Sequence, residues 1–198
     1  MITIPPLNDI ATKAHENAKA KGFWPEDANV NEKVMLIICE LCEAIEALRT
    51  GKHAVAKDLD WLDRMERTPR TNFKDLFVDS GIKDTFEDEI ADTLIRLLDL
   101  SERWDIDVDK CVELSCNDWK NNYQKIENIS EKALELTVVI ATLPSIRASS
   151  NLPVRFRIGD LICELFAIAD HYGFDLMRHV NAKMKYNLSR PPLHGKNF

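Results

Sequence analysis

Glycine is scarce in this sequence, at 6 of 198 residues. The alternation of apolar and polar residues at period two, which marks a half-buried strand, is also absent along the chain. Apolar residues recur instead at intervals of three and four, the spacing that places them on one face of a helix. We therefore predict an all-α fold.

A long apolar run is missing as well. No run in the sequence approaches the roughly 18 residues that a membrane-spanning helix needs. No signal-peptide pattern opens the sequence either. We expect a cytoplasmic protein with no membrane partner.

Positive charge is in deficit, with 26 Lys and Arg against 33 Asp and Glu and a formal net charge of −7. A protein that binds nucleic acid needs a basic face to neutralise phosphates, so we expect no nucleic-acid partner. A negatively charged chain can still bind a nucleotide if a metal ion supplies the positive charge.

The five cysteines show no disulfide framework. Their number is odd, and most of them lie within apolar helical patterns, as reduced buried thiols do. Cys39 and Cys42 form a CxxC in the middle of a predicted helix, not at a helix N-terminus where a thiolate would be stabilised. We therefore favour packing over a redox or zinc role.

The stretch around which the rest is organised is Glu32 to Arg49. Its apolar run from Val34 to Ile45 is interrupted by Glu40 and Glu43, two acids three residues apart. That spacing puts the two carboxylates side by side on one edge of the helix, next to the apolar stripe. Like charges at the border of a core need a cation, a proton or water beside them.

A second helix, predicted over Glu87 to Leu100, repeats the pattern with Glu89 and Asp92 at the edge of another apolar stripe. If the two helices pack against each other, four carboxylates converge on one point. Such a set of oxygen ligands suits Mg²⁺, or Mn²⁺ as the alternative. The competing interpretation is that these acids are the solvated rims of two amphipathic helices.

The chain is predicted to contain two related halves, 1–126 and 127–198, packed as one unit. Shifting the sequence by 68 residues aligns Asp160 with Asp92, but places Arg157 on Glu89. The first half therefore holds the acids, and the second is a degenerate copy. Between the acid pairs, the block 54–83 is expected to cover or line the site, with residues 71–83 irregular. In the second half, Pro144 is expected to break a helix that spans 131–143.

With its ExxE and ExxD helices, the chain resembles the MazG-like all-α nucleoside triphosphate pyrophosphohydrolases. The resemblance is closest to a bacterial and phage subgroup. It covers most of 8–53 and 84–110 and about the last 25 residues. Its motifs are KGFW at Lys21–Trp24, the Glu32–Lys52 segment, DTFEDEIADTLIRLLDL at Asp84–Leu100 and KMKYNLSRPPLHGK at Lys183–Lys196. The long segment 108–179 departs from compact members of the subgroup, as does the wide gap between the acid pairs.

The resemblance implies Mg²⁺-dependent hydrolysis of a nucleoside triphosphate to a nucleoside monophosphate and pyrophosphate. Glu40, Glu43, Glu89 and Asp92 would hold the metal, and Glu43 is the favoured base. Lys183, Asn187 and Arg190 match the family's last helix and would hold phosphate oxygens. Lys52 and Trp24 are further substrate-binding candidates. For Lys52 a charge that complements the helix C-terminus is the favoured explanation, and for Trp24 a core role explains the residue at least as well.

Two other functions stay open at this point. One is a dUTPase-type member of the same fold, which would share the metal site and differ in the base pocket. The other is a helical regulator that binds nucleotides without hydrolysing them. Because MazG-like proteins dimerise, the degenerate second half is expected to act as an internal partner in a pseudo-dimer. We therefore expect a monomer or a simple homodimer.

Overall fold

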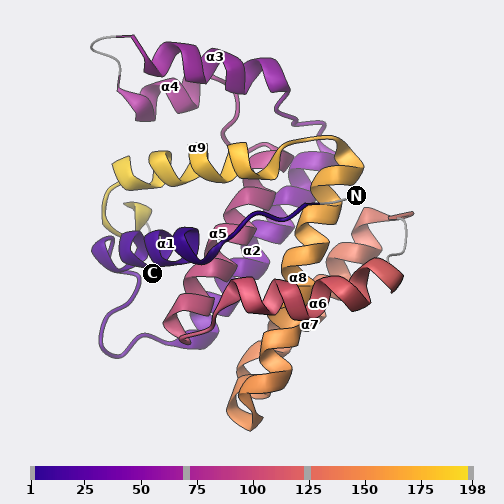
Figure 1. Ribbon diagram of the computed structural model, residues 1–198. Helices are drawn as coiled ribbons and strands as arrows, with labels where there is room; N and C mark the ends of the chain where they lie inside the picture. The colour runs from indigo at the N-terminus through magenta and orange to yellow at the C-terminus, as the bar shows by residue number, and fades with distance from the viewer. Residues whose placement is uncertain (1–2, 69–71, 123–125, 196–198) are drawn as a thin grey trace.

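The described part of the chain is all helical. The computed structural model describes residues 3–68, 72–122 and 126–195, and for 116–122 the backbone alone (Figure 1). No strand occurs within these residues, in agreement with the predicted all-α class. None of their helices is both long and apolar enough to cross a membrane. The helices are α1 (Asn8–Ala20), α2 (Val30–Arg49), α3 (Ala56–Glu66), α4 (Phe73–Asp79), α5 (Phe86–Arg103), α6 (Val108–Asn122), α7 (Ile129–Ser149), α8 (Asn151–Tyr172) and α9 (Leu176–Ser189).

Local capping residues set several of these helix ends. The Thr85 side chain accepts a hydrogen bond from the backbone N–H of Asp88 and so begins α5, as its sequence position predicts. Gly173 ends α8 in the left-handed conformation, with φ at 75°, and Asp175 then caps α9. The turn between α8 and α9 is therefore encoded locally.

Helices α2 and α5 pack side by side in the centre of the fold (Figure 1). Helix α1 and helix α9 both lie against α5, and helix α7 lies against α2. Helix α8 packs on α6 and α7, so that one apolar core extends from Leu7 to Val180. The two predicted halves share this core.

Helices α3 and α4 form a small outer layer beyond α9 (Figure 1). Their own apolar cluster includes Leu59, Leu62 and Phe77, and it packs against Tyr186 of α9. The rings of Phe77 and Tyr186 stack with their centroids 4.6 Å apart. The block 54–83 thus covers the outer side of α9, and its two ends meet the acids of α5, where the backbone N–H of Ala54 bonds to Glu87 and where Asp84 follows the block.

Two segments differ from the sequence prediction. Residues 73–79 form α4 and are not irregular, because the Asn72 side chain caps the helix and Phe77 is fully buried. Pro144 lies inside α7 and does not end it. The helix continues because Leu143 and Ile146, on either side of the proline, pack in the core. The sequence also predicts a helix that Asp107 caps and that runs to Tyr123, a residue outside the described part of the chain.

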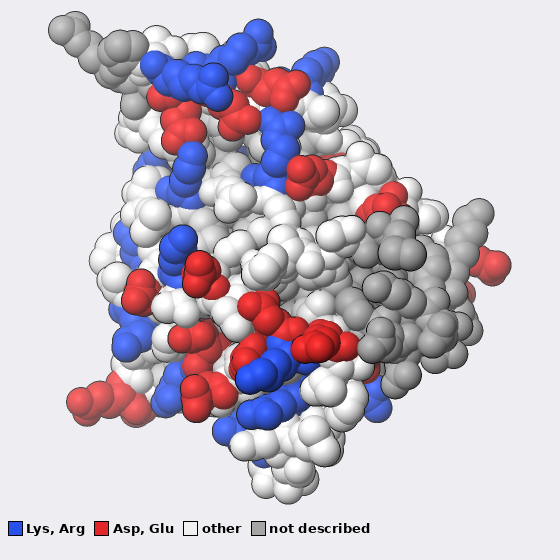
Figure 2. All heavy atoms as spheres, viewed as in Figure 1, with Lys and Arg blue, Asp and Glu red and all other residues white. Residues whose placement is uncertain are grey.

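Charges of both signs are interspersed over the face shown in Figure 2, and they gather over α3 and α4. Some of them are paired across the outer layer: Arg178 of α9 bonds to Asp60 and Asp63 of α3, and Lys185 bonds to Glu66. These exposed pairs contribute little to stability individually, roughly 0–1 kcal/mol each.

Candidate metal centre

The first two turns of α5 bury four acids. Glu87, Asp88, Glu89 and Asp92 are all at most 4% exposed. The buried carboxylate of Glu87 has hydrogen-bond partners of its own, because it accepts from the ring of His53 and from the backbone N–H of Ala54, each at 2.8 Å. The other three belong to a larger cluster. Burial of this kind excludes the solvated-rim interpretation for α5, since an isolated buried carboxylate is costly.

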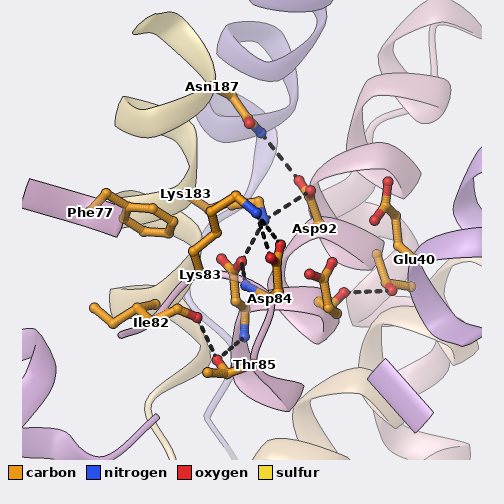
Figure 3. Close-up of polar contacts among 12 residues, drawn as sticks. Glu40, Phe77, Ile82, Lys83, Asp84, Thr85, Asp92, Lys183 and Asn187 are labelled. Atoms are coloured by element: carbon orange, nitrogen blue, oxygen red, sulfur yellow. Dashed lines mark hydrogen bonds and ion pairs between the residues drawn. The ribbon is translucent and has the colours of Figure 1, made fainter. Parts of the chain in front are cut away.

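Three carboxylates from two helices converge on one point. Glu40 of α2 and Glu89 and Asp92 of α5 each offer an oxygen, and these oxygens lie within 4.8 Å of one another. Figure 3 shows Glu40 facing Asp92 across the gap between the helices. Packing of α2 against α5 places them there, as the two motifs predict. The set is suited to a hard cation such as Mg²⁺.

Two basic side chains are built into the same cluster. The Arg96 Nε lies 2.6 Å from an oxygen of Glu40. The Lys183 ammonium reaches from α9 to Asp88 at 2.6 Å and to Asp92 at 3.2 Å (Figure 3). We call the four acids Glu40, Asp88, Glu89 and Asp92 together with Arg96 and Lys183 the acid site. With all four acids ionised, the two bases leave it with a net charge of −2.

The four acids of the acid site differ in the direction of their pKa shifts. Burial raises the pKa of Glu89 to about 9 and that of Asp88 to about 6, against the pull of Lys183. Burial and the nearby Asp92 also raise the pKa of Glu40. For Asp92, burial is outweighed by the Lys183 ammonium and the Arg96 guanidinium, so its pKa is lowered. Without a metal, the site therefore takes up protons that a bound cation would displace.

Glu43 lies outside the tight group of oxygens. Its side chain is exposed one turn after Glu40, and it lines an open cavity of about 370 Å³ beside Glu89. Lys52 and Asp84 line the same cavity. The structure thus brings together three of the four predicted metal ligands and places the fourth on the wall of the adjoining cavity.

The last helix lies beside the acids. Asn187 donates a hydrogen bond to Asp92 at 3.2 Å (Figure 3), and the Arg190 guanidinium lies 3.5 Å from the Asn187 amide oxygen. Asn187 is buried and Arg190 is half-buried. Lys183 and Asn187 therefore face α5 from α9, whereas Arg190 follows the end of the helix in extended backbone and contacts the group only through Asn187.

Trp24 lies farther along α5. Its indole N–H donates to Asp99 at 2.8 Å, and Asp99 also bonds to the His15 ring at 2.6 Å. Asp99 is about two helical turns beyond Asp92. This placement anchors the loop after α1 to α5, and it keeps Trp24 apart from the carboxylate group.

Sequence reasoning missed Arg96 and Asp88. Arg96 follows Asp92 by four residues, and this spacing could have shown that both lie on one face of α5. The position of Asp88, three residues after Thr85, predicts only a role in capping the helix. It does accept a hydrogen bond from the backbone N–H of Asp84, at 3.1 Å, but its main partner is Lys183. That contact joins residues 95 positions apart, and no local pattern predicts it.

A second cavity, of about 420 Å³, lies where α6, α7 and α8 meet. It contains the residues that the shift of 68 aligns with the acid site: Ser115 for Lys183, Arg157 for Glu89 and Asp160 for Asp92. When the helix that follows Ser130 is compared with the Glu32–Arg49 helix, Val139 takes the place of Glu40, and Val139 is also on the wall of this cavity. We call this the counterpart cavity.

Comparisons of the chain with protein-family models, with curated proteins and with solved structures gave no match.

Proposed function

We propose that this protein hydrolyses a nucleoside triphosphate to a nucleoside monophosphate and pyrophosphate, with Mg²⁺ bound by Glu40, Glu89 and Asp92. One observation carries the proposal: three buried carboxylates from two helices converge next to an open cavity. When all four acids of the acid site are ionised, a single divalent cation balances its net charge of −2. The resemblance of the ExxE and ExxD helices to the MazG-like family supports the same conclusion.

The bound metal would neutralise triphosphate oxygens and thereby favour attack at phosphorus. The remaining steps use side chains of this chain. Glu43 lies on the wall of the cavity, where a water molecule can reach it, and we assign it the role of base. The water oxygen attacks the α-phosphorus, its proton passes to Glu43, and the bond from the α-phosphorus to the bridging oxygen breaks to release pyrophosphate.

Lys183 and Asn187 serve first to hold Asp92. The ammonium keeps Asp92 ionised, and the amide fixes the orientation of its other oxygen. Lys52 lines the cavity at its exposed edge and is placed to meet phosphate oxygens, which suits an electrostatic role in a preorganised site. Arg190 acts through Asn187.

The pseudo-dimer is part of this proposal. Helix α9 of the second half packs on α5 of the first, and α6 of the first half packs on α8 of the second. Such a reciprocal exchange of last helices is what two fused copies related by a two-fold axis would produce. An internal partner makes further association unnecessary, so we expect a monomer or a simple homodimer by light scattering. A stable tetramer would contradict this expectation.

The test is release of pyrophosphate and nucleoside monophosphate with Mg²⁺ or Mn²⁺ across the canonical nucleotides, dUTP and commonly damaged nucleotides. The matched control is Asp160→Asn in the counterpart cavity, which should leave turnover unchanged. If no triphosphate is hydrolysed with either metal, or if Glu40→Gln turns over like the unaltered protein, the proposal fails. A preference for dUTP would assign the dUTPase-type specificity.

A further inference from the structure

The turn that follows α9 lies against the KGFW motif that follows α1 (Figure 1). We call residues 190–195 the C-terminal turn. The Lys21 ammonium donates to the backbone carbonyls of Leu188, at 2.8 Å, and Arg190, at 2.5 Å. The Lys21 carbonyl accepts from the backbone N–H of Leu193 at 2.8 Å. A single lysine therefore makes three of the hydrogen bonds between two motifs that lie about 170 positions apart in the sequence.

The backbone of the C-terminal turn is strained. Leu193 and His194 follow each other in the left-handed conformation, with φ at 47° and 54°. In this conformation the Cβ of an L-amino acid crowds the following carbonyl oxygen. Residues held in this way are concentrated at ligand clamps and at segments that switch between two arrangements. The strain therefore marks the turn as a candidate for movement.

The turn closes a small cavity next to the acid site. The cavity measures about 30 Å³, and its wall contains Asp92 and Arg96 together with Asn17 of α1 and His194 of the turn. Nδ1 of His194 and Oδ1 of Asn17 are both buried, and neither has a hydrogen-bond partner among the described residues. Unpaired buried polar atoms are costly, and this space admits only about one water molecule. The closed turn thus leaves polar groups unsatisfied beside the acids.

The acid site lies between this closed cavity and the open one. Glu89 and Lys52 line the open cavity, whereas Asp92 and Arg96 line the closed one. A nucleotide that crosses the acid site with its phosphates in the open cavity meets the closed cavity with its nucleoside.

The closed cavity has a chemistry that suits a nucleoside. Its wall contains the ring of Phe23, which the His194 ring contacts edge-on with centroids 5.0 Å apart, and the amide of Asn17. A flat heteroaromatic ring can stack on Phe23 and bond to the amide. The carboxylates of Asp92 and Asp99, on the same wall, repel phosphate oxygens.

We propose that the C-terminal turn is a lid, closed in this structure, which opens to admit the nucleoside part of the substrate between Phe23 and Asn17. The proposal rests on the proposed function for its ligand. Opening breaks the contacts of Lys21 with the turn and moves the His194 ring away from Phe23. Since only molecules with an open lid bind, the closed lid weakens the apparent affinity by the fraction that is open.

Hydrogen exchange of the Leu193 and His194 backbone N–H groups measures opening, because both are hydrogen-bonded in the closed lid. The probes are the α,β-imido analogues of dUTP and of the canonical nucleotides, added with Mg²⁺ to the full chain. The analogue that binds should make both N–H groups exchange about 10-fold faster or more.

Lys21→Met removes the ammonium and keeps the length of the side chain. Exchange at both N–H groups should become about 3–10-fold faster without any analogue, and analogue binding should tighten by a similar factor. The matched control is Lys19→Met, an exposed lysine at the end of the same helix, which should change neither.

His194→Asn separates the ring from the backbone of the lid. Asparagine tolerates the left-handed conformation, so the turn stays closed while the ring is lost. Analogue binding should tighten without faster exchange at Leu193. This variant also decides the matter if Lys21→Met does not fold.

Slower exchange with the analogue bound would show that the turn closes on the substrate, and it would overturn the lid. Equal analogue affinities in Lys21→Met and Lys19→Met, or in His194→Asn and the unaltered protein, would overturn it as well. These results leave the proposed hydrolysis standing. If no analogue binds, the lid fails together with its ligand. If an analogue binds and opens the lid but no triphosphate is hydrolysed, the lid stands and the proposed hydrolysis fails.

Discussion

The acid site and the counterpart cavity are built by the same kind of helix packing and differ in how their charges are satisfied. In the acid site, Lys183 reaches across from α9 to a buried aspartate of α5. At the aligned position, Ser115 of α6 only donates a hydrogen bond to the backbone carbonyl of Phe156 at 3.1 Å. The charged pairs in the counterpart cavity are partly exposed: Arg157 lies 3.6 Å from Asp160 on the same helix, and Lys132 of α7 lies 3.5 Å from Glu164 of α8.

The difference shows what a binding site requires beyond a cavity. Both places have a cavity of several hundred Å³. In one, buried acids outnumber the bases, and their pKa values are displaced. In the other, an arginine stands where the acid site has Glu89, and Gly159 lets α6 approach α8 closely. A surplus of buried negative charge is therefore the property that separates them, and the experiments below are chosen to test it.

The largest effect should be on activity. Glu40→Gln or Asp92→Asn removes a negative charge from the carboxylate group and keeps the volume, so kcat/KM for triphosphate hydrolysis should fall by about 10²–10³-fold. Pyrophosphate release and Mg²⁺ titration measure this, with circular dichroism to confirm that the helices remain. Asp160→Asn in the counterpart cavity should change neither. If Asp160→Asn lowered kcat/KM as much as the acid-site variants do, the counterpart cavity would also take part in the reaction, and the contrast between the two regions would be wrong.

The next effect is on stability. Lys183→Met removes the partner of two buried aspartates, so the free energy of unfolding should drop by about 3–5 kcal/mol in urea titrations at pH 8. Ser115→Ala, its counterpart, should cost only about 1 kcal/mol. Lys185→Met, on the exposed side of the same helix, should cost less than about 1 kcal/mol. A Lys183 variant as stable as the Lys185 variant would show that the buried ammonium does not compensate the acids.

A smaller effect should appear as a pH dependence. The pKa of Glu89 is about 9 in the folded chain, above its ordinary value of 4.5, because burial disfavours the charged form. Between these values the folded chain keeps a proton that the unfolded chain has lost, so its contribution to stability falls as pH rises through this window.

Metal-free Glu89→Gln should therefore match the unaltered protein near pH 5 and exceed its unfolding free energy at pH 9 by about 1–3 kcal/mol. Addition of Mg²⁺ at pH 8 should stabilise the unaltered protein and leave this variant unchanged. Parallel pH profiles for the two proteins would contradict a buried, proton-binding Glu89. Arg157→Gln, the change at the aligned position, should leave the slope of the profile as it is.

The smallest effect concerns the packing of the counterpart helices. A Cβ on Gly159 would overlap the backbone carbonyl of Cys111 and the Ser115 hydroxyl, so Gly159→Ala should cost about 1–3 kcal/mol by thermal or urea unfolding. The aligned change in the first half, Ala91→Gly, should cost about 1 kcal/mol through helix propensity. If Gly159→Ala were neutral, the close approach of α6 and α8 would not be required.

Helix positions were largely predictable, because capping and apolar spacing act within a few residues. Thr85 and Asp175 cap the predicted helices, and the apolar stripes of α2 and α5 are buried as expected. The errors arose where tertiary packing overrode a local signal. Pro144 stays inside a helix because its neighbours are held in the core, and α4 forms because Phe77 packs against Tyr186.

The sequence by itself determined that Glu40, Glu89 and Asp92 lie at the edges of apolar stripes, since spacing fixes the angle of each side chain around its helix. Only the tertiary structure decided which edges are covered. Packing of α9 across α5 buries Asp88 and brings Lys183 to it, whereas Glu43, one turn from Glu40, remains exposed. The physical reason is that helical periodicity fixes the direction in which a side chain points from its helix. Its burial and its partners depend on which other helix packs against that face.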